Sequence, residues 1–313
     1  MMKQVIAVFV VSVYALPGQQ CSGADQAQSV AGPIDLILVA GQSNAVGFDT
    51  KPAELPADAA DQQIMFWWRC GDPPPDDHDS ICGGKWTHLR PQPRGNPSQD
   101  KTYAGGRQYG NFRFPEGGFG PEMGLARTLH AKQGKRLAIV KAAFSGTSMT
   151  HDWTTTNAGS GGECYHALVA EIRAAIAAAK QQGIALRPRA FVWVQGESDA
   201  NAQAASRYEK ALGDMLAALR RDLAAPEMLA LIGVNTRFGG VDKVTQMVQA
   251  IIDAQKSLAA KDSRCAYVDT DGATLANVAH FDSAGTLDVG RRFAEALLKL
   301  EAERMKRTQA KGG

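Results

Sequence analysis

Apolar residues in this chain gather in two kinds of segment that alternate along it. Short, continuous apolar runs are typical of strands buried on both faces of a parallel sheet, and they occupy residues 34–40, 137–143, 190–194, 229–234 and 265–268. Segments with a helical pattern lie between and after them, at residues 121–132, 163–182, 201–223, 243–260 and 284–304. This alternation predicts a five-stranded parallel sheet covered by helices on both faces, which is a three-layer α/β/α sandwich.

One long stretch breaks the alternation. Residues 48–119 are rich in Pro, Gly, Trp and Asp. We interpret them as a loop-rich insertion after the first strand and not as a separate domain. Residues 25–313 are therefore expected to form a single domain.

The first 24 residues have the pattern of an export signal. Lys3 supplies a positive start, residues 5–16 an apolar run, and residues 22–24 a group of small side chains. The run is too short to span a bilayer as a helix, which needs about 20 residues. The sequence predicts a signal peptide over residues 1–24 and a secreted or periplasmic protein. The alternative is that the run forms an N-terminal element of the fold.

Export changes the expected state of the cysteines, because oxidising compartments favour disulfides. Cys70 and Cys82 flank a loop rich in Pro and Asp that cannot pack a core of its own. We expect a disulfide between these two residues. A bridge between Cys164 and Cys265 is a weaker alternative.

Composition and charge limit the classes of partner. Of the 313 residues, 44% are hydrophobic and 21% charged, and the formal net charge is +2, which is typical of a soluble globular protein. No basic stripe or acidic block indicates a nucleic-acid or membrane partner. No segment after the N-terminus is long and apolar enough to span a membrane, and no oligomeric state is indicated.

Ser43 follows the first predicted strand, within Gly41-Gln42-Ser43-Asn44. Sites in parallel sheets gather where strands end at their carboxyl edge. A serine on a tight turn from strand to helix exposes its hydroxyl beside backbone N–H groups, which suits a nucleophile. The alternative is that Ser43 only caps the next helix.

Two further polar segments follow neighbouring strands. Gly146, within residues 144–148, lets the backbone approach a ligand and point its N–H inward, unless it belongs to an ordinary turn. Residues 193–199, Trp-Val-Gln-Gly-Glu-Ser-Asp, place oriented donors and acceptors at the end of the middle strand. Glu197 and Asp199 equally suit the acidic first turn of the following helix.

A serine nucleophile needs a base, and His280 is placed to supply it. Histidine titrates in the right range for this role. Among the six histidines, His280 follows the last predicted strand, in a loop that can fold back over the sheet edge. His151 and His166 lie nearer the segment of Gly146 and are alternatives.

Together these motifs resemble the SGNH-hydrolase superfamily, and more narrowly the sialate O-acetylesterase domain and carbohydrate esterase family 6, which includes acetyl xylan esterases. The matching motifs lie in order at residues 41–44, 119–122, 146–148, 193–199, 280–282 and 290–294. The resemblance implies an SGNH-type, flavodoxin-like sandwich. It also implies a serine nucleophile and ester hydrolysis without a metal or another cofactor.

The resemblance assigns further roles to residues of this chain. It implies an oxyanion hole made by the backbone N–H groups of Ser43 and Gly146 and the side chain of Gln195. We assign substrate binding to three residues near these motifs, Gln42, Asn44 and Trp153.

One position departs from the family's pattern. The family usually carries an Asp three residues before the histidine, and this chain has Asn277 there. An amide can orient an imidazole, but it does not stabilise the imidazolium as a carboxylate does. Glu197 is our first candidate for the acid. Asp199 and Asp282 are alternatives, and a site without an acid is the remaining one.

The sequence thus predicts a secreted serine esterase that removes acetyl groups from a carbohydrate, either acetyl xylan or a related polysaccharide, through an acetyl-serine intermediate. A sialate O-acetylesterase is an alternative within the same class. Two alternatives come from other classes: a polysaccharide O-acetyltransferase that uses the same serine, and a carbohydrate-binding relative without activity.

Overall fold

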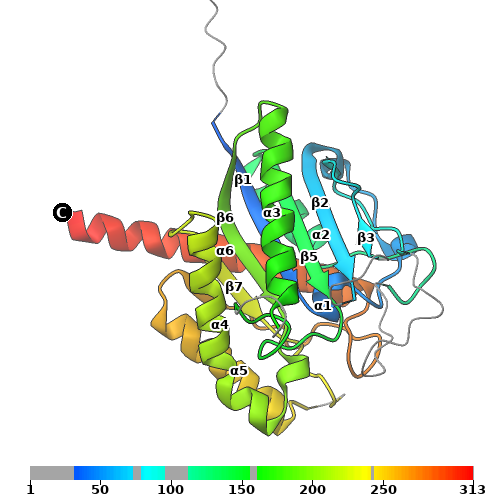
Figure 1. The fold of residues 1–313 in the computed structure, drawn as a ribbon, viewed down its shortest axis with the longest axis vertical. Helices are drawn as coiled ribbons and strands as arrows, with labels where there is room; N and C mark the ends of the chain where they lie inside the picture. The colour runs from blue at the N-terminus through cyan, green and yellow to red at the C-terminus, as the bar shows by residue number, and fades with distance from the viewer. Residues whose placement is uncertain (1–31, 73–78, 96–111, 156–160, 241–242, 313) are drawn as a thin grey trace, which may run out of the picture. The chain divides into compact units, whose positions relative to one another are not determined.

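A largely parallel sheet forms the centre of this computed structural model, which describes residues 32–72, 79–95, 112–155, 161–240 and 243–312. Its strands lie in the order β3-β2-β5-β1-β6-β7-β8, with β4 paired to β2 (Figure 1). The five predicted apolar runs form β1 (Ile34–Gly41), β5 (Leu137–Phe144), β6 (Leu186–Val194), β7 (Leu229–Gly233) and β8 (Cys265–Tyr267). Residues from Pro33 onward belong to one compact unit. The expected signal peptide, residues 1–24, lies outside the described residues.

The segment 48–119 contains a full strand of the sheet, so its interpretation as a loop-rich insertion was incomplete. β2 (Ile64–Gly71) pairs in parallel with β5, and the short strands β3 (Ser80–Ile81) and β4 (Thr87–His88) pair with β2 in antiparallel fashion. Among the residues that the structure describes, the sheet therefore has eight strands and not five. β2 was not predicted because aromatic residues interrupt its aliphatic pattern. Trp67 and Trp68 lie on opposite faces of the sheet, and both are buried.

Helices cover both faces of the sheet, which confirms the predicted three-layer sandwich (Figure 1). One face packs against α3 (Glu163–Gln181), α4 (Ala202–Asp222) and α5 (Gln246–Lys261), and the other against α1 (Ser43–Val46), α2 (Glu122–Gln133) and α6 (Ser283–Gly312). Three 3-10 turns complete the elements: η1 (Pro52–Glu54), η2 (Ala59–Gln63) and η3 (Glu197–Asp199). Within the described residues, no helix has the length and apolar character needed to cross a membrane.

The expected disulfide between Cys70 and Cys82 is not formed. Both residues are free thiols, as are Cys164 and Cys265. The β2–β3 register pairs Cys70 with Ser80, while the Cys82 N–H bonds to the Trp68 carbonyl. The two cysteines are thus diagonal neighbours, at a typical Cα separation of about 7–8 Å, which is wider than a disulfide usually spans. Strand pairing closes this loop instead, and burial raises the pKa of the Cys70 thiol to about 12.

A buried ion pair lies beneath α1. The side chains of Lys141, on β5, and Glu122, at the start of α2, are fully buried, and their Nζ and Oε1 atoms are 3.0 Å apart. Lys141 Nζ also donates to the Val46 carbonyl and to Gln92 Oε1, each at 2.7 Å. Glu122 Oε1 accepts the Gly120 N–H at 2.8 Å. The lysine thereby ties the last residue of α1 to the sheet and to the Phe-Gly-Pro-Glu motif.

We predict that Lys141→Met lowers the free energy of unfolding by about 3–5 kcal/mol, because it leaves the Glu122 charge buried without its partner. The double variant Lys141→Met/Glu122→Gln should recover most of this loss, since glutamine keeps an acceptor for the Gly120 N–H. Urea unfolding measures both variants. The control is Lys210→Met, whose ion pair with Asp214 is exposed and should change stability by less than about 1 kcal/mol. A single Lys141 variant as stable as the wild type would contradict the prediction.

Candidate active site

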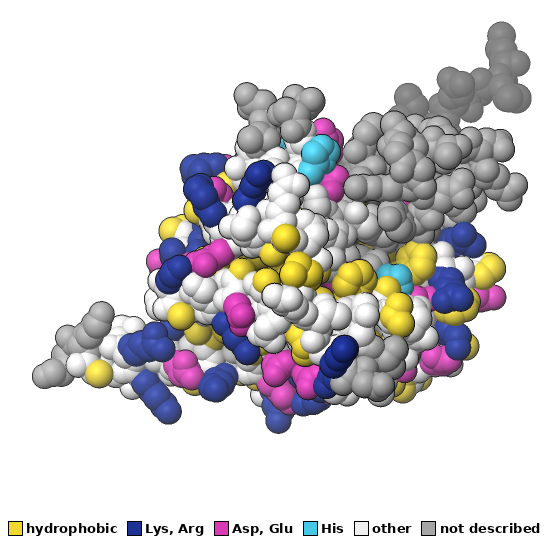
Figure 2. All heavy atoms as spheres, turned by 90° about the horizontal axis from the view of Figure 1, so that it is seen from below, with side chains coloured by type: hydrophobic (Ala, Val, Ile, Leu, Met, Phe, Trp, Pro, Cys, Tyr) yellow, Lys and Arg dark blue, Asp and Glu magenta, His cyan; other side chains and the backbone are white. Residues whose placement is uncertain are grey.

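The first part of the site is the turn from β1 into α1. Gly41 has φ of 139°, and a Cβ at this position would lie 2.1 Å from the Val194 carbonyl oxygen, so only glycine fits. The Gln42 N–H bonds to that same oxygen at 3.1 Å. Ser43 therefore begins α1 directly above the carboxyl end of the sheet. Figure 2 looks onto this edge of the molecule, where hydrophobic side chains form a band across the face and charged groups lie mainly around it.

The structure brings Ser43 and His280 together from opposite ends of the chain. His280 Nε2 lies 2.9 Å from Ser43 Oγ across a sequence separation of 237 residues. The loop that carries His280 is fixed on both sides of the imidazole by Asn44, whose Nδ2 donates to the Ala279 carbonyl and whose Oδ1 accepts the Phe281 N–H, each at 3.0 Å. The expected contact between serine and histidine is present.

The carboxylate beside the imidazole belongs to Asp49, which the sequence analysis did not identify. Asp49 Oδ2 lies 2.7 Å from His280 Nδ1, so Ser43, His280 and Asp49 form a continuous hydrogen-bonded chain. Asp49 lies in the turn that follows α1 and is 231 residues from His280 in sequence. No motif spacing identifies an acid in this place, because the family's acid comes from the histidine loop itself.

Three neighbours keep Asp49 ionised: His280, Asn277 and Arg113. Asn277 Nδ2 donates to Asp49 Oδ2 at 2.7 Å, and Arg113 Nη1 donates to Oδ1 at 3.0 Å. Burial by itself would raise the pKa of Asp49, but the hydrogen bonds from His280, Asn277 and Arg113 outweigh it and lower the pKa to about 2. Asn277 Oδ1 also accepts the N–H groups of Ala279 and His280. Asn277 thus shapes the histidine loop and supports the acid without replacing it.

The three acids proposed from the sequence lie elsewhere. Glu197 Oε1 accepts from Asn44 Nδ2 at 2.7 Å and from the Asn235 N–H at 3.2 Å, and burial raises its pKa. Asp199 accepts the Met149 N–H at 2.7 Å. Both carboxylates lie in η3 and accept hydrogen bonds from backbone N–H groups and side-chain amides. Neither hydrogen-bonds to the imidazole of His280.

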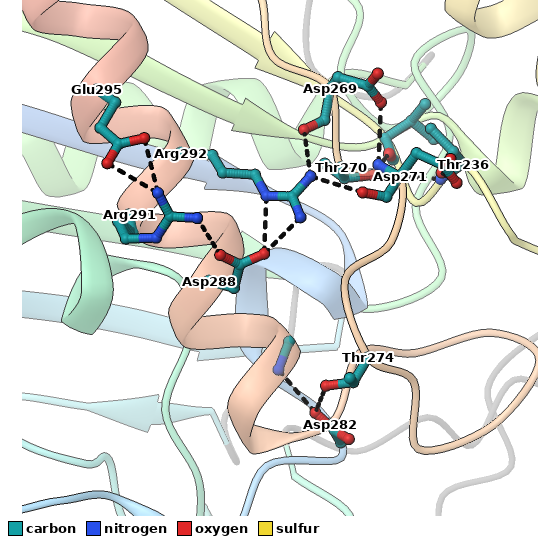
Figure 3. A network of polar contacts seen from close by, with 12 residues as sticks. Thr236, Asp269, Thr270, Asp271, Thr274, Asp282, Asp288, Arg291, Arg292 and Glu295 are labelled. Carbon is teal, nitrogen blue, oxygen red and sulfur yellow. Dashed lines mark hydrogen bonds and ion pairs between the residues drawn. The ribbon is translucent and has the colours of Figure 1, made fainter.

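Asp282 caps the last helix. Figure 3 shows its carboxylate at the start of α6, where Oδ1 accepts from Thr274 Oγ1 at 2.6 Å and from the Gly285 N–H at 2.7 Å. Farther along the same helix, Asp288 is held by Arg291 and Arg292. Asp282 is therefore a structural residue of the helix N-terminus.

Gln195 does not point its amide at an oxyanion. Its Nε2 donates to the Thr147 carbonyl at 3.0 Å and to Asp199 Oδ2 at 2.6 Å, and its Oε1 accepts from Tyr208 Oη at 2.9 Å. Both amide hydrogens are thus engaged, and the side chain is fully buried. Gln195 instead holds the peptide between Thr147 and Ser148, one residue beyond Gly146, whose φ of 69° is in the left-handed region.

The three residues assigned to substrate binding belong to the scaffold. Trp153 is fully buried, packs edge-on against Trp193 and donates to Thr147 Oγ1. Gln42 and Asn44 are also buried; Gln42 Oε1 accepts the Gly196 and Ser198 N–H groups at 3.4 and 3.3 Å.

Two apolar side chains beside the histidine are accessible instead. The Phe48 ring, which is partly exposed, lies 5.0 Å from the His280 ring between centroids. Val278, two residues before the histidine, is 51% exposed. These two residues offer apolar surface next to the reactive pair.

The three-layer fold and the hydrogen-bonded chain of Ser43, His280 and Asp49 suit a carboxylic ester hydrolase. A family model described as carbohydrate esterase, sialic acid-specific acetylesterase matches residues 33–299. The chain belongs to this family of carbohydrate esterases. No curated protein matches the chain.

Solved structures share the fold at low sequence identity. A protein from Arabidopsis thaliana has a TM-score of 0.62 at 19% identity, over 86% of this chain and 99% of its own. NanS has a TM-score of 0.58 at 20% identity, over 87% of this chain and 98% of its own. A carbohydrate acetylesterase from Xanthomonas citri has a TM-score of 0.51 at 16% identity, over 84% of this chain and 55% of its own. At these identities the likeness concerns the fold.

We predict that Asp49→Asn lowers kcat on an aryl acetate by up to about 10⁴-fold, the loss that the same change causes in a serine protease. The neutral amide would no longer stabilise the imidazolium or fix its tautomer. Asp282→Asn is the matched control: it changes an acid close to His280 in sequence that caps α6, and it should keep most of the activity. Equal losses in the two variants would show that Asp49 has no special role.

Proposed function

We propose that this protein hydrolyses O-acetyl esters of carbohydrates through an acetyl-serine intermediate. The observation that carries the proposal is the hydrogen-bonded chain from Ser43 Oγ through the His280 imidazole to Asp49. A hydroxyl bonded to an imidazole that is bonded in turn to an ionised carboxylate is the arrangement that activates serine for acyl transfer.

The proposed reaction has two steps. Ser43 Oγ attacks the acetyl carbonyl while His280 takes its proton, and the sugar oxygen leaves with that proton as the C–O bond breaks. Water then attacks the acetyl-serine while His280 takes a proton from it. The bond between Ser43 Oγ and the acyl carbon breaks, His280 returns the proton to Ser43 Oγ, and acetate is released. Asp49 stabilises the imidazolium in both steps. We assign the oxyanion to the N–H groups of Ser43 and Gly146. We assign to Gln195 the holding of the Thr147 carbonyl, next to Gly146 in the sequence.

The choice of sugar belongs to the proposal as well. The sequence resemblance favours acetyl xylan or a related polysaccharide, whereas the matching family model is described as sialic acid-specific. Acetate release from O-acetylated xylan and from O-acetylated sialic acid, measured side by side, separates the two. Activity that needs a sugar acceptor and releases no acetate would indicate a transferase.

We predict that Ser43→Ala abolishes acetate release and leaves the urea midpoint close to that of the wild type. Gln42 and not Ser43 is the N-cap of α1, and alanine suits the helical backbone at position 43. A fluorophosphonate should label the wild type at Ser43 and leave the variant unlabelled. Substantial residual turnover in the variant, or labelling at another residue, would refute Ser43 as the nucleophile. A wild type that binds the acetylated sugar but never turns it over would favour a non-catalytic relative.

We also propose that the protein is exported, on the basis of the Lys3 charge, the apolar residues 5–16 and the small residues 22–24. Expression of the full chain should yield a mature protein that begins near residue 25 and is found in the periplasm or medium. N-terminal sequencing of the purified protein tests this. A cytoplasmic protein that retains residues 1–24 would refute it.

A further inference from the structure

Glu197 bonds to Asn44, the residue that directly follows Ser43. Its side chain is buried at the end of β6, in η3. Oε1 accepts two hydrogen bonds, one from Asn44 Nδ2 at 2.7 Å and one from the Asn235 N–H at 3.2 Å. Oε2 is buried and has no hydrogen-bond partner among the described residues. A single carboxylate oxygen therefore bonds both to the side chain of Asn44 and to the backbone of Asn235.

Both asparagines converge on the loop of the histidine. The Ala279 carbonyl accepts from Asn44 Nδ2 at 3.0 Å and from Asn235 Nδ2 at 3.1 Å. Asn44 Oδ1 accepts the Phe281 N–H at 3.0 Å. The peptides on both sides of His280 are thus bonded to the residue that directly follows Ser43.

The contact with Glu197 fixes which way the Asn44 amide faces. With Nδ2 directed at Glu197 and Ala279, Oδ1 must face Phe281. If the amide turned over, two oxygens would face its carbonyl and an N–H would face its amino group. Glu197 therefore selects the only orientation of Asn44 that holds the histidine loop.

We propose that Glu197 is a positioning residue that sets the distance between Ser43 Oγ and His280 Nε2 by locking Asn44 and Asn235 onto the histidine loop. This inference rests on the proposed esterase function and assigns Glu197 a role other than the triad acid. Glu197 touches neither the imidazole nor the reacting atoms. Its effect passes through the asparagines to the alignment of nucleophile and base.

The test compares variants that remove the hydrogen bond between Glu197 and Asn44 with one that keeps it. Glu197→Leu removes the acceptor and should lower kcat on an aryl acetate about 100-fold, the order expected when reacting groups move by about 1 Å, with KM little changed. The rate of fluorophosphonate labelling at Ser43 should fall in parallel. Glu197→Gln keeps an oxygen at the position of Oε1 and should restore most of the activity, although it carries no charge.

Asn44→Leu removes the donor of the same hydrogen bond and should lose as much activity as Glu197→Leu. Because both changes interrupt one path, the double variant should lose no more than the worse single variant. Arg220→Leu is the control for general destabilisation: Arg220 is buried, bonds to Asp262 and the Met228 carbonyl, and makes no contact with the site. It should lower the urea midpoint and leave kcat unchanged.

A folded Glu197→Leu variant with wild-type kcat and labelling rate would overturn the proposal, as would a Glu197→Gln variant as inactive as Asp49→Asn, which would make Glu197 an ionised catalytic group. If Glu197→Leu does not fold, Asn44→Leu decides in the same way. Failure of the esterase assignment is distinct, since it appears as a wild-type protein that releases no acetate and takes up no label.

Discussion

The buried ammonium group of Lys141 bonds to the short segment after β1, which includes Ser43 and Asp49. Lys141 points from the sheet toward α1, and its three donors go to the Val46 carbonyl, Gln92 and Glu122. Desolvating a charge in an apolar layer is costly unless hydrogen bonds and an opposite charge compensate for it, so this arrangement constrains the backbone around it. The constrained backbone is the short segment that begins with Ser43 and ends with Asp49. Ser43 and Asp49 therefore belong to one short segment that is bonded to the sheet through Val46.

Sheet topology explains why that unit meets the histidine. β1 is central, and its neighbours β5 and β6 run parallel to it on either side. The segments that follow all three strands consequently reach the same edge, as expected where connections diverge from a central strand. The loop after β8 returns to this edge and is bonded there through Ala279 and Phe281. His280 thus reaches both Ser43 and Asp49 at this edge.

Sequence reasoning succeeded where a side chain's place follows from the end of a strand. The contact between Ser43 and His280 could be expected in this way, because apolar runs locate the strands and the parallel sheet brings their ends together. Sequence reasoning failed where the position of a polar side chain depends on which other polar groups are buried beside it. Asp49 lies in a turn without a periodic pattern. Gln195 points inward because the Thr147 carbonyl and Asp199 both accept hydrogen bonds from its amide. β2 was missed because its aromatic residues, buried on both faces, do not form the aliphatic run that marked the other strands.

The location of Asp49 explains why an asparagine suits position 277. Asp49 Oδ2 accepts from both His280 Nδ1 and Asn277 Nδ2, each at 2.7 Å. An aspartate at 277 would place a second carboxylate against that oxygen, and like charges at such a distance raise one of the two pKa values strongly. One acid would then be protonated in the pH range where the other must stay ionised. Once the acid is supplied from the segment after Ser43, position 277 requires a neutral donor that still accepts the N–H groups of Ala279 and His280, and asparagine meets both requirements.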